Sequence, residues 1–540
     1  MYIFNLIVAV MKSLVIFTLF IFNNCVFSSE DLFPLTIIHM NDMHARFEET
    51  NMLANTCKEN DKCIGGFARV VTKVKELRAN SPNPIFLNAA DNFQGTYWYN
   101  LFRWNVTQHF LNLEPADAMT LGNHEFDHGI EGLMPFLNRI KTPILSCNIN
   151  ATAEPKFAEK INNSIIIERS GRKIGIIGVT TTFPSDWGNA KVLPEIESVR
   201  KEVDKLVEQG VNIIIVLSHS GLEVDKEMAK HGGPIDLIVG GHTHSFLFTG
   251  KPVGPDKVVG EYPTIETQEN GRKVLIVQAS AFNKYLGNIQ LFFDDDGEVK
   301  RYEGSPIFLS NEVPQDPMIL KEIKPWKTVV DKVLKKTVGF VKNQHDSFCY
   351  NRECGMGNLI ADSMTFAFLN NRSEGEWTGA SIALHGPGLI RAGLSPGKVI
   401  LADLFTTTPF ENKIVSLELP GFAIREALEF SVSKPILHVM QVSGIKVVYD
   451  LNRNPFNRIV DLKVLCQKCE IPRYETINDE QYYRVILSDY LANGGDSFSM
   501  FPKYRRNMFE GPLDIDALSE YVRKRSPINT PSLLKRIQFV

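Results

Sequence analysis

The sequence predicts an α/β protein in two parts, and three observations lead to this expectation. Over residues 33–316, apolar runs typical of buried strands alternate with charged stretches of helical spacing. Near Pro314-Gln315-Asp316-Pro317 the pattern changes to a charged helical stretch, after which a second region begins with its own strands and Gly-rich turns. The length of 540 residues, 44% hydrophobic and 22% charged, suits two or three globular domains.

The elements of the first part follow from local patterns. Short apolar runs predict strands at 35–40, 85–87 and 235–239, and nearly continuous apolar runs predict strands covered on both faces at 173–179 and 211–217. Helical spacing predicts helices at 65–79, 106–112, 130–140 and 195–209. A further charged helix is predicted from Ile319 to Lys336, as the connector to the second part.

The N-terminus has the pattern of a secretory signal, residues 1–29. Lys12 precedes the apolar run 13–22, and Ser28-Ser29 forms a small-residue exit. The run ends well short of the ~20 apolar residues that a membrane span needs, which favours cleavage over an anchor. Residues 533–540 lack the hydrophobic tail of ~10–20 residues that a lipid-anchor signal requires. We therefore expect a secreted, extracellular protein without a membrane anchor.

Charge and cysteine usage agree with an exported protein. A net charge of -4 gives no electrostatic case for nucleic acid, so an anionic substrate must be held by local charges, including metal. Six of the 8 cysteines form short-range pairs that predict disulfide loops: Cys57 with Cys63, Cys349 with Cys354, and Cys466 with Cys469. A metal or redox CxxC is the alternative for the last pair, but no second CxxC with zinc spacing accompanies it. Four sequons predict glycosylation at Asn105, Asn150, Asn162 and Asn371.

Five loops after apolar strands carry polar residues of metal-ligand type. They contain Asp42 and His44, Asp91, Asn123 and His124, His219, and His242 and His244. In open α/β sheets, sites lie outside the carboxyl ends of strands, where these loops belong. Carboxylate, imidazole and amide oxygen suit borderline divalent cations. Two histidine-bearing half-sites with a central aspartate predict a two-metal centre, with one carboxylate between ions about 3.5–4 Å apart, and so metal-activated hydrolysis.

Single histidines are weaker indicators. Taken alone, Gly122 to Asp127 could be turn chemistry, with Asp127 as a helix N-cap rather than as the group that orients His124. The remaining histidines that we consider are interpreted as ordinary core or surface residues; they are His39, His128, His231, His345 and His438.

The order D-x-H, D-N, GNHE-x-D, H, GH-x-H resembles the calcineurin-like metallophosphoesterases, and nearly all of the mature chain resembles the 5′-nucleotidase/apyrase family. The resemblance is carried by Ile64-Gly65-Gly66, Asp91 to Thr96, Leu121 to Asp127, Gly240 to His242, and Ala492 to Phe498. It implies an N-terminal metallophosphoesterase α/β sandwich (33–316), a linker helix (317–336) and a second α/β domain that binds nucleotide (337–540).

The resemblance also implies the roles of individual residues. One metal would be held by Asp42, His44, His244 and the bridging Asp91, and the other by Asp91, Asn123, His219 and His242. His124, oriented by Asp127, would stabilise the phosphoryl charge and assist the leaving oxygen, while a water activated by the two metals attacks phosphorus. The metals would be two divalent ions, with Zn, Mn, Mg, Ca and Co as candidates.

In this family the second domain holds the nucleotide. The base would stack between Phe410 and Phe498, each of which could instead be a core residue, and Arg391 would hold phosphate. Arg352 and Asp496 are further candidates for substrate binding. The family's N-G-G-G-I-R turn reads His385 to Arg391 here, one residue longer, and its C-R-x-R-E-C motif has Tyr350 in place of the first arginine. The acidic ribose contact beyond Phe498 is not evident.

Because the catalytic residues are intact and the substrate-binding residues differ, we expect a secreted apyrase. It would hydrolyse ATP and ADP to AMP and phosphate, as in the salivary apyrases of blood-feeding arthropods, and so inhibit platelet aggregation. A soluble 5′-nucleotidase acting on AMP is the first alternative, and an inactive platelet-binding protein is the second. The expected partner is the nucleotide, not nucleic acid, and the chain is expected to be a monomer or homodimer.

Overall fold

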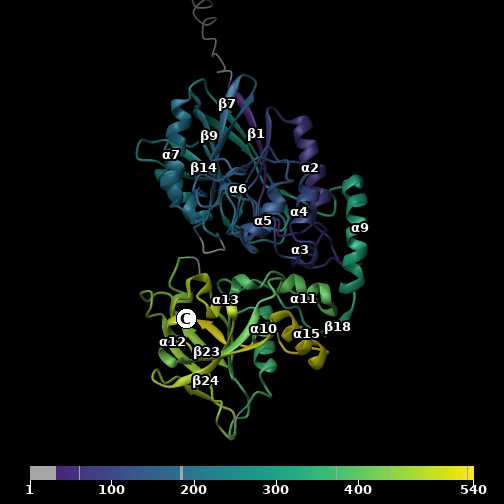
Figure 1. Cartoon of the computed structure of the whole chain (residues 1–540), viewed down its shortest axis with the longest axis vertical. Helices are drawn as coiled ribbons and strands as arrows, with labels where there is room; N and C mark the ends of the chain where they lie inside the picture. The colour runs from purple at the N-terminus through teal and green to yellow at the C-terminus, as the bar shows by residue number, and fades with distance from the viewer. Residues whose placement is uncertain (1–31, 60, 183–186, 373, 436, 532) are drawn as a thin grey trace, which may run out of the picture.

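The computed structural model describes residues 32–540 except 60, 183–186, 373, 436 and 532, so the predicted signal lies outside the described residues. Figure 1 shows the N-terminal half above the C-terminal half, with a long helix, α9 (Pro317–Leu334), along one side of both. The two halves have separate sheets and each has a core of its own, while Ala402 of the C-terminal half also joins a core of the N-terminal half.

The N-terminal half is a sandwich of two mixed sheets. The first has the order β16 (Val299–Gly304), β15 (Tyr285–Phe293), β1 (Phe33–Met40), β2 (Pro84–Asn88), β3 (Ala118–Thr120) and β4 (Ile144–Leu145), with β17 (Ile307–Phe308) beside β15. The second has the order β13 (Thr264–Thr267), β14 (Lys273–Val277), β10 (Leu237–Val239), β9 (Ile213–His219), β7 (Arg172–Thr180) and β6 (Ser164–Arg169). In the first sheet β1 to β4 are parallel and antiparallel strands lie on the β15 side, whereas the second sheet has parallel central strands and an antiparallel strand at each edge.

One core joins these sheets face to face. Leu35 and Ile37 of β1 share it with Ile213 and Ile215 of β9. The neighbouring residues of β1, such as Ile38, face the opposite way into a second core beneath the helices, as the two-residue period of a strand requires. Every residue of β9 is buried, which agrees with its continuous apolar sequence.

Helices cover the outer faces of the sandwich, and short elements connect them. The helices are α2 (Phe67–Asn80), α3 (Tyr97–Phe102), α4 (Trp104–Leu111), α5 (Gly129–Leu137), α6 (Pro155–Ala158), α7 (Glu195–Glu208) and α8 (Leu222–His231). The short strands β5 (Ile149–Asn150) and β8 (Lys191–Val192) form one pair, and β11 (Phe246–Leu247) and β12 (Val258–Gly260) form another. Asp316 caps α9, accepting from the amides of Met318 and Ile319 at 2.9 and 3.1 Å.

The C-terminal half contains a five-stranded sheet and a four-stranded sheet. The first has the order β22 (Gln441–Ser443), β19 (Ile382–His385), β26 (Tyr482–Ser488), β21 (Lys413–Pro420) and β27 (Arg506–Leu513), and the second β25 (Tyr474–Thr476), β24 (Ile459–Leu465), β23 (Ile445–Tyr449) and β28 (Ile537–Phe539). β18 (Thr337–Val341) pairs with β20 (Gly397–Ile400). The helices are α10 (Gly355–Ala367), α11 (Leu401–Thr407), α12 (Gly421–Ser431), α13 (Asp489–Ala492), α14 (Met500–Tyr504) and α15 (Asp514–Arg525).

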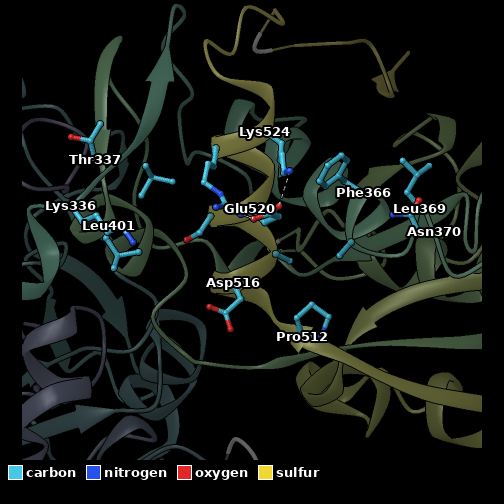
Figure 2. A pocket seen from close by; sticks show the side chains of 15 residues that line it. Lys336, Thr337, Phe366, Leu369, Asn370, Leu401, Pro512, Asp516, Glu520 and Lys524 are labelled. Carbon is cyan, nitrogen blue, oxygen red and sulfur yellow. Dashed lines mark hydrogen bonds and ion pairs between the residues drawn. The ribbon is translucent and has the colours of Figure 1, made fainter.

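The predicted α/β fold is therefore confirmed, with two larger sheets in each half and helices packed against them. Within the described part of the chain, no helix is both long and apolar enough to cross a membrane. A surface hollow of about 750 Å³ lies beside α15, near the ends of α9 and α10 and the start of α11. Its lining residues include Lys336, Asp516 and Lys524 (Figure 2). None of the predicted site residues lines this hollow.

Candidate active site

The predicted ligand residues meet where strands of both N-terminal sheets end. The loop after β1 carries Asp42 and His44, those after β2 and β3 carry Asp91 and Asn123, His219 ends β9, and the loop after β10 carries His242 and His244. Parallel strands direct their carboxyl ends to one edge of a sheet, so residues up to 202 positions apart come together. The structure brings all seven together, and their role as ligands stays a prediction.

The backbone of these loops is unusual. Asp42, His44, Asp91, His242 and His244 all have a positive φ, between 47° and 73°. This left-handed region costs a residue with a side chain about 1–2 kcal/mol, and such residues cluster at functional sites because the surrounding structure holds them there. We infer that this backbone conformation serves to direct the five side chains toward one another.

The first group comprises Asp42, His44 and His244. Nε2 of His244 lies 3.3 Å from Oδ1 of Asp42 and 3.0 Å from Nε2 of His44. Nδ1 of His44 donates to the carbonyl oxygen of Gln94 at 3.0 Å, so in the neutral ring Nε2 carries a lone pair. Two imidazole nitrogens thus face each other beside a carboxylate, an arrangement that a cation between them would stabilise.

The second group comprises Asp91, Asn123, His219 and His242. Nε2 of His219 lies 3.1 Å from Oδ2 of Asp91, and Nδ1 of His242 lies 3.0 Å from Oδ1 of Asn123. Nδ1 of His219 donates to the carbonyl oxygen of Ala89 at 2.7 Å, which turns Nε2 toward the carboxylate. Oδ2 of Asp91 also lies 3.7 Å from Nε2 of His44, so Asp91 stands between the groups.

The donor set of both groups fits divalent metal. Burial opposes a charge on His219, but Asp91 outweighs this and raises the pKa of His219 to about 10, so the pair attracts a positive charge. A metal ion would replace that proton. Burial lowers the pKa of His242 to about 3 and lowers that of His244, which keeps both rings neutral, the form in which histidine binds metal.

His124 and Asp127 lie beside these groups as a pair. Nδ1 of His124 is 2.9 Å from Oδ2 of Asp127, and the amide of His124 donates to Oδ1 of Asp91 at 3.0 Å. Burial tends to lower the pKa of His124, but Asp127 and Asp91 together raise it above its ordinary value. Asp127 thus orients the ring and favours its protonated form.

Two predicted residues of the C-terminal half reach His124. Nη2 of Arg391 lies 2.8 Å from Nε2 of His124, and the Phe410 ring stacks on the His124 ring with centroids 5.6 Å apart. The guanidinium of Arg391 also lies 5.1 Å from the centre of the Phe410 ring. The site is therefore completed by both halves of the chain.

The other predicted substrate residues have partners other than His124. Arg352 pairs with Asp346 at 2.8 Å, and Asp496 accepts from the hydroxyl of Tyr490 at 2.9 Å. The Phe498 ring is only 1% exposed, and its ring neighbours are Phe430 and Phe501, at 5.0 and 5.5 Å. Its predicted stacking on a base stays a prediction, and in this arrangement Phe498 is a core residue.

Sequence reasoning missed two neighbours of the first group. Arg46 is 1% exposed, and its Nη1 donates to the carbonyl oxygens of His44 and Gly95 at 2.9 and 2.5 Å. Its guanidinium lies 4.3 Å from the centre of the Phe282 ring, which also contacts the rings of His44 and His244 at 5.6 and 5.2 Å. Arg46 follows His44 by two positions and could have been suspected, but nothing in the local sequence indicates Phe282.

Disulfides and sequons complete the predicted set. The structure contains the disulfides Cys57–Cys63, Cys349–Cys354 and Cys466–Cys469. The four sequon residues Asn105, Asn150, Asn162 and Asn371 are exposed, and their glycosylation stays a prediction.

Family models give the class of the protein. The model of the calcineurin-like phosphoesterases matches residues 35–246, and that of the 5′-nucleotidase C-terminal domain matches residues 336–503. The first match covers every predicted metal ligand and the second covers Arg391 and Phe410. Together with the donor groups, they define a metal-dependent phosphohydrolase.

Individual relatives narrow this class. An apyrase from Tabanus yao is 45% identical over 512 residues, covering 92% of each chain, and the 5′-nucleotidase of Mus musculus is 40% identical over 524 residues, covering 94% and 90%. The crystal structure of a 5′-nucleotidase precursor from Thermus thermophilus superposes with a TM-score of 0.86 at 31% identity, covering 94% and 99%. The chain belongs to the 5′-nucleotidase and apyrase family and is a metal-dependent nucleotide phosphohydrolase.

Proposed function

We propose that this chain is a secreted apyrase that hydrolyses extracellular ATP and ADP to AMP and phosphate, with two divalent ions at the groups described above. The observation that carries this choice is Tyr350, which stands where the AMP-cleaving members that the sequence resembles have an arginine. The 45% identity to the apyrase from Tabanus yao supports the assignment of this chain as an apyrase.

The residues around His124 suit a phosphoryl group. His124 approaches from the N-terminal half and Arg391 from the C-terminal half, with their nitrogens 2.8 Å apart. A phosphate placed there would separate the two side chains and accept from both, and the planar guanidinium matches phosphate oxygens. When bound, divalent ions would offset phosphate charge and lower the pKa of a water. His124 would then donate toward the leaving oxygen.

Tyr350 would distinguish AMP from ATP and ADP because it lacks the positive charge of an arginine. Its side chain is 42% exposed, and its hydroxyl lies 3.5 Å from the position that a Cβ would take at Gly388, in the Gly-rich turn before Arg391. Tyrosine offers a hydrogen bond but no positive charge at neutral pH. Arg352, in the same disulfide loop, is engaged by Asp346. Tyr350 therefore adds no positive charge to that of Arg391, whereas a polyphosphate has more oxygens than a monophosphate with which to bind the ions and Arg391.

A 5′-nucleotidase that acts on AMP is the second candidate. The 40% identity to the mouse 5′-nucleotidase over most of both chains favours it. The two candidates share the metal groups and differ in the substrate that the C-terminal half accepts.

Phosphate release from ATP, ADP and AMP, each with and without a chelator, separates the candidates. We expect chelator-sensitive release from ATP and ADP and at least about tenfold slower release from AMP, a difference of about 1.4 kcal/mol. Tyr350→Arg is expected to raise AMP hydrolysis, and Tyr350→Phe, which keeps the ring, is the matched control. Equal rates on all three nucleotides would make the chain a nucleotidase of broad range instead.

The remaining features of the proposal have their own tests. Sequencing the N-terminus of protein recovered from the medium tests cleavage after residue 29, and ADP-induced platelet aggregation tests the physiological role. Metal analysis identifies the ions, and sedimentation distinguishes monomer from homodimer. Limited proteolysis tests the proposed boundaries at 316 and 336, because exposed linkers are cleaved first.

A further inference from the structure

Glu125 is a buried carboxylate with an unusual set of partners. It is 1% exposed, and among the described residues no lysine or arginine forms an ion pair with it. Its partners are three backbone amides: Gly122 and Asp91 donate to Oε2 at 2.8 and 3.1 Å, and Asn92 donates to Oε1 at 2.7 Å. Its two carboxyl oxygens therefore accept three hydrogen bonds from the backbone.

These amides belong to two different loops. Asp91 and Asn92 follow β2, whereas Gly122 follows β3 and directly precedes Asn123. One side chain thus ties the loop of the central carboxylate to the loop of the amide ligand. It holds Asp91 where the backbone has φ of 50°, next to Ala90 with φ of 70°. Such strain persists only where the surroundings enforce it.

The two loops approach as closely as backbone allows. A Cβ at Gly122 would lie 2.2 Å from Oδ1 of Asp91 and 2.8 Å from Nε2 of His219, so only glycine fits. The amide of His124 donates to the same Oδ1 at 3.0 Å. A shift of either loop by a few tenths of an ångström would therefore move Asp91 relative to His219 and Asn123.

We propose that Glu125 is a positioning residue that sets the spacing between Asp91 and Asn123 and thereby allows the second group, with His219 and His242, to hold its metal ion. The inference rests on the proposed two-metal function. Glu125 touches neither the expected ions nor the substrate, and it acts through the two loops. The first group depends on it less, because Asp42, His44 and His244 come from other loops and only Asp91 is shared with the second group.

A role in the general stability of the fold explains less well why a buried Glu125 accepts hydrogen bonds from two loops. A buried carboxylate carries a large desolvation cost, and an apolar side chain of similar volume is often as stabilising. The carboxylate provides two acceptor oxygens side by side, which can bind amides of two loops at once. Partners of metal ligands typically change metal affinity or activity by about 10–100-fold when they are replaced.

Glu125→Gln tests the proposal. Glutamine keeps the volume but has a single acceptor oxygen, so its NH₂ group must face at least one of the three amides. We expect the metal-free variant to fold with the far-UV circular dichroism of the parent. Calorimetric titration with Mn²⁺ or Co²⁺ should show one ion bound with nearly unchanged affinity and the other bound about 10–100-fold more weakly. Excess metal should restore kcat, with the KM for ATP unchanged.

Two further variants complete the experiment. Glu131→Gln is the matched control, since Glu131 is exposed on α5 six residues further on, and it should bind both ions as the parent does. Glu125→Asp keeps the charge but shortens the reach, and its second affinity should lie between those of the parent and Glu125→Gln.

Two results would overturn the proposal. One is two ions bound by Glu125→Gln with the parent's affinities. The other is loss of the metal-free fold in both Glu125 variants, which would make the residue structural. A parent chain that binds no divalent ion would instead refute the two-metal function itself, so the two failures are distinguishable.

Discussion

The two halves of the molecule meet at His124, but they are built in different ways there. On the N-terminal side, every candidate ligand lies against another one. Arg46 and Glu125 form hydrogen bonds with the backbone of the ligand loops, and Phe282 packs against His244. On the C-terminal side, Arg391 and Phe410 reach His124, whereas Phe498 is buried in its own core. We therefore expect the first region to govern whether phosphate is released and the second to govern which nucleotide is accepted.

The largest effect that separates the regions should come from Asp91. Asp91→Asn replaces the carboxylate that stands between the two groups, and metal contributes several kcal/mol to such reactions. We expect phosphate release from every nucleotide to fall by about 1,000-fold or more. Metal content, measured by elemental analysis, should fall as well. Asp204→Asn, on the exposed face of α7, is the control and should leave both unchanged. Full activity in Asp91→Asn would remove the basis for the central role given to this residue.

The next effect should come from His124 and should leave the metal in place. His124→Gln removes a proton donor, which typically costs about 10²–10⁴-fold in rate. We expect kcat to fall within this range for ATP and ADP alike, while metal content stays that of the parent. Loss of metal in this variant would show that His124 serves as a ligand, since it also lies close to His44 and Asp91.

A smaller and substrate-dependent effect should come from the C-terminal half. Arg391→Lys keeps the charge but loses the planar fork that matches phosphate. We expect kcat/KM for ATP and ADP to fall by about 10–100-fold, as for loss of about 1.5–3 kcal/mol from a charge-assisted hydrogen bond. Phe410→Ala should mainly raise KM. Steady-state kinetics of both variants test this expectation. If the fall in kcat/KM were accompanied by loss of metal, the proposal that the two halves have separate roles would be wrong.

The smallest effect concerns stability and compares one buried histidine from each half. Burial lowers the pKa of His39 to about 3 and that of His385 to about 4, from an ordinary value of 6.5. The unfolded chain therefore binds more protons below pH 6.5, so stability falls as the pH falls. Each histidine should cost about 2 kcal/mol at pH 5.

His39→Phe tests this cost in the N-terminal half. The His39 ring stacks on Tyr262 with centroids 6.0 Å apart, and a phenyl ring can keep that packing. Denaturant unfolding at pH 7 and pH 5 should show a smaller loss of stability in the variant than in the parent. The same loss in both proteins would mean that His39 is not responsible for the acid sensitivity.

Much of the site was predictable from the sequence because ligands follow strands. Asp42, His44, His219 and His242 each stand at or just after an apolar run, and parallel strands carry such ends to one edge of a sheet. The short spacing of the cysteines likewise predicted the disulfides that the structure contains. In these cases local order and the regular geometry of strands and short loops are sufficient.

Other features depended on contacts between distant parts of the chain, which no local pattern encodes. Arg391 and Phe410 reach His124 only because the C-terminal half packs below the N-terminal sheets (Figure 1). Within the C-terminal half, tertiary packing likewise places Phe498 beside Phe430 and Phe501, and its stacking on a base stays a prediction. Glu125 was visible in the sequence as part of a motif, but its partners belong to backbone amides that only the folded loops bring together. The sequence by itself determined the chemical groups of the site, and the tertiary structure decided their spacing and which of them face a substrate.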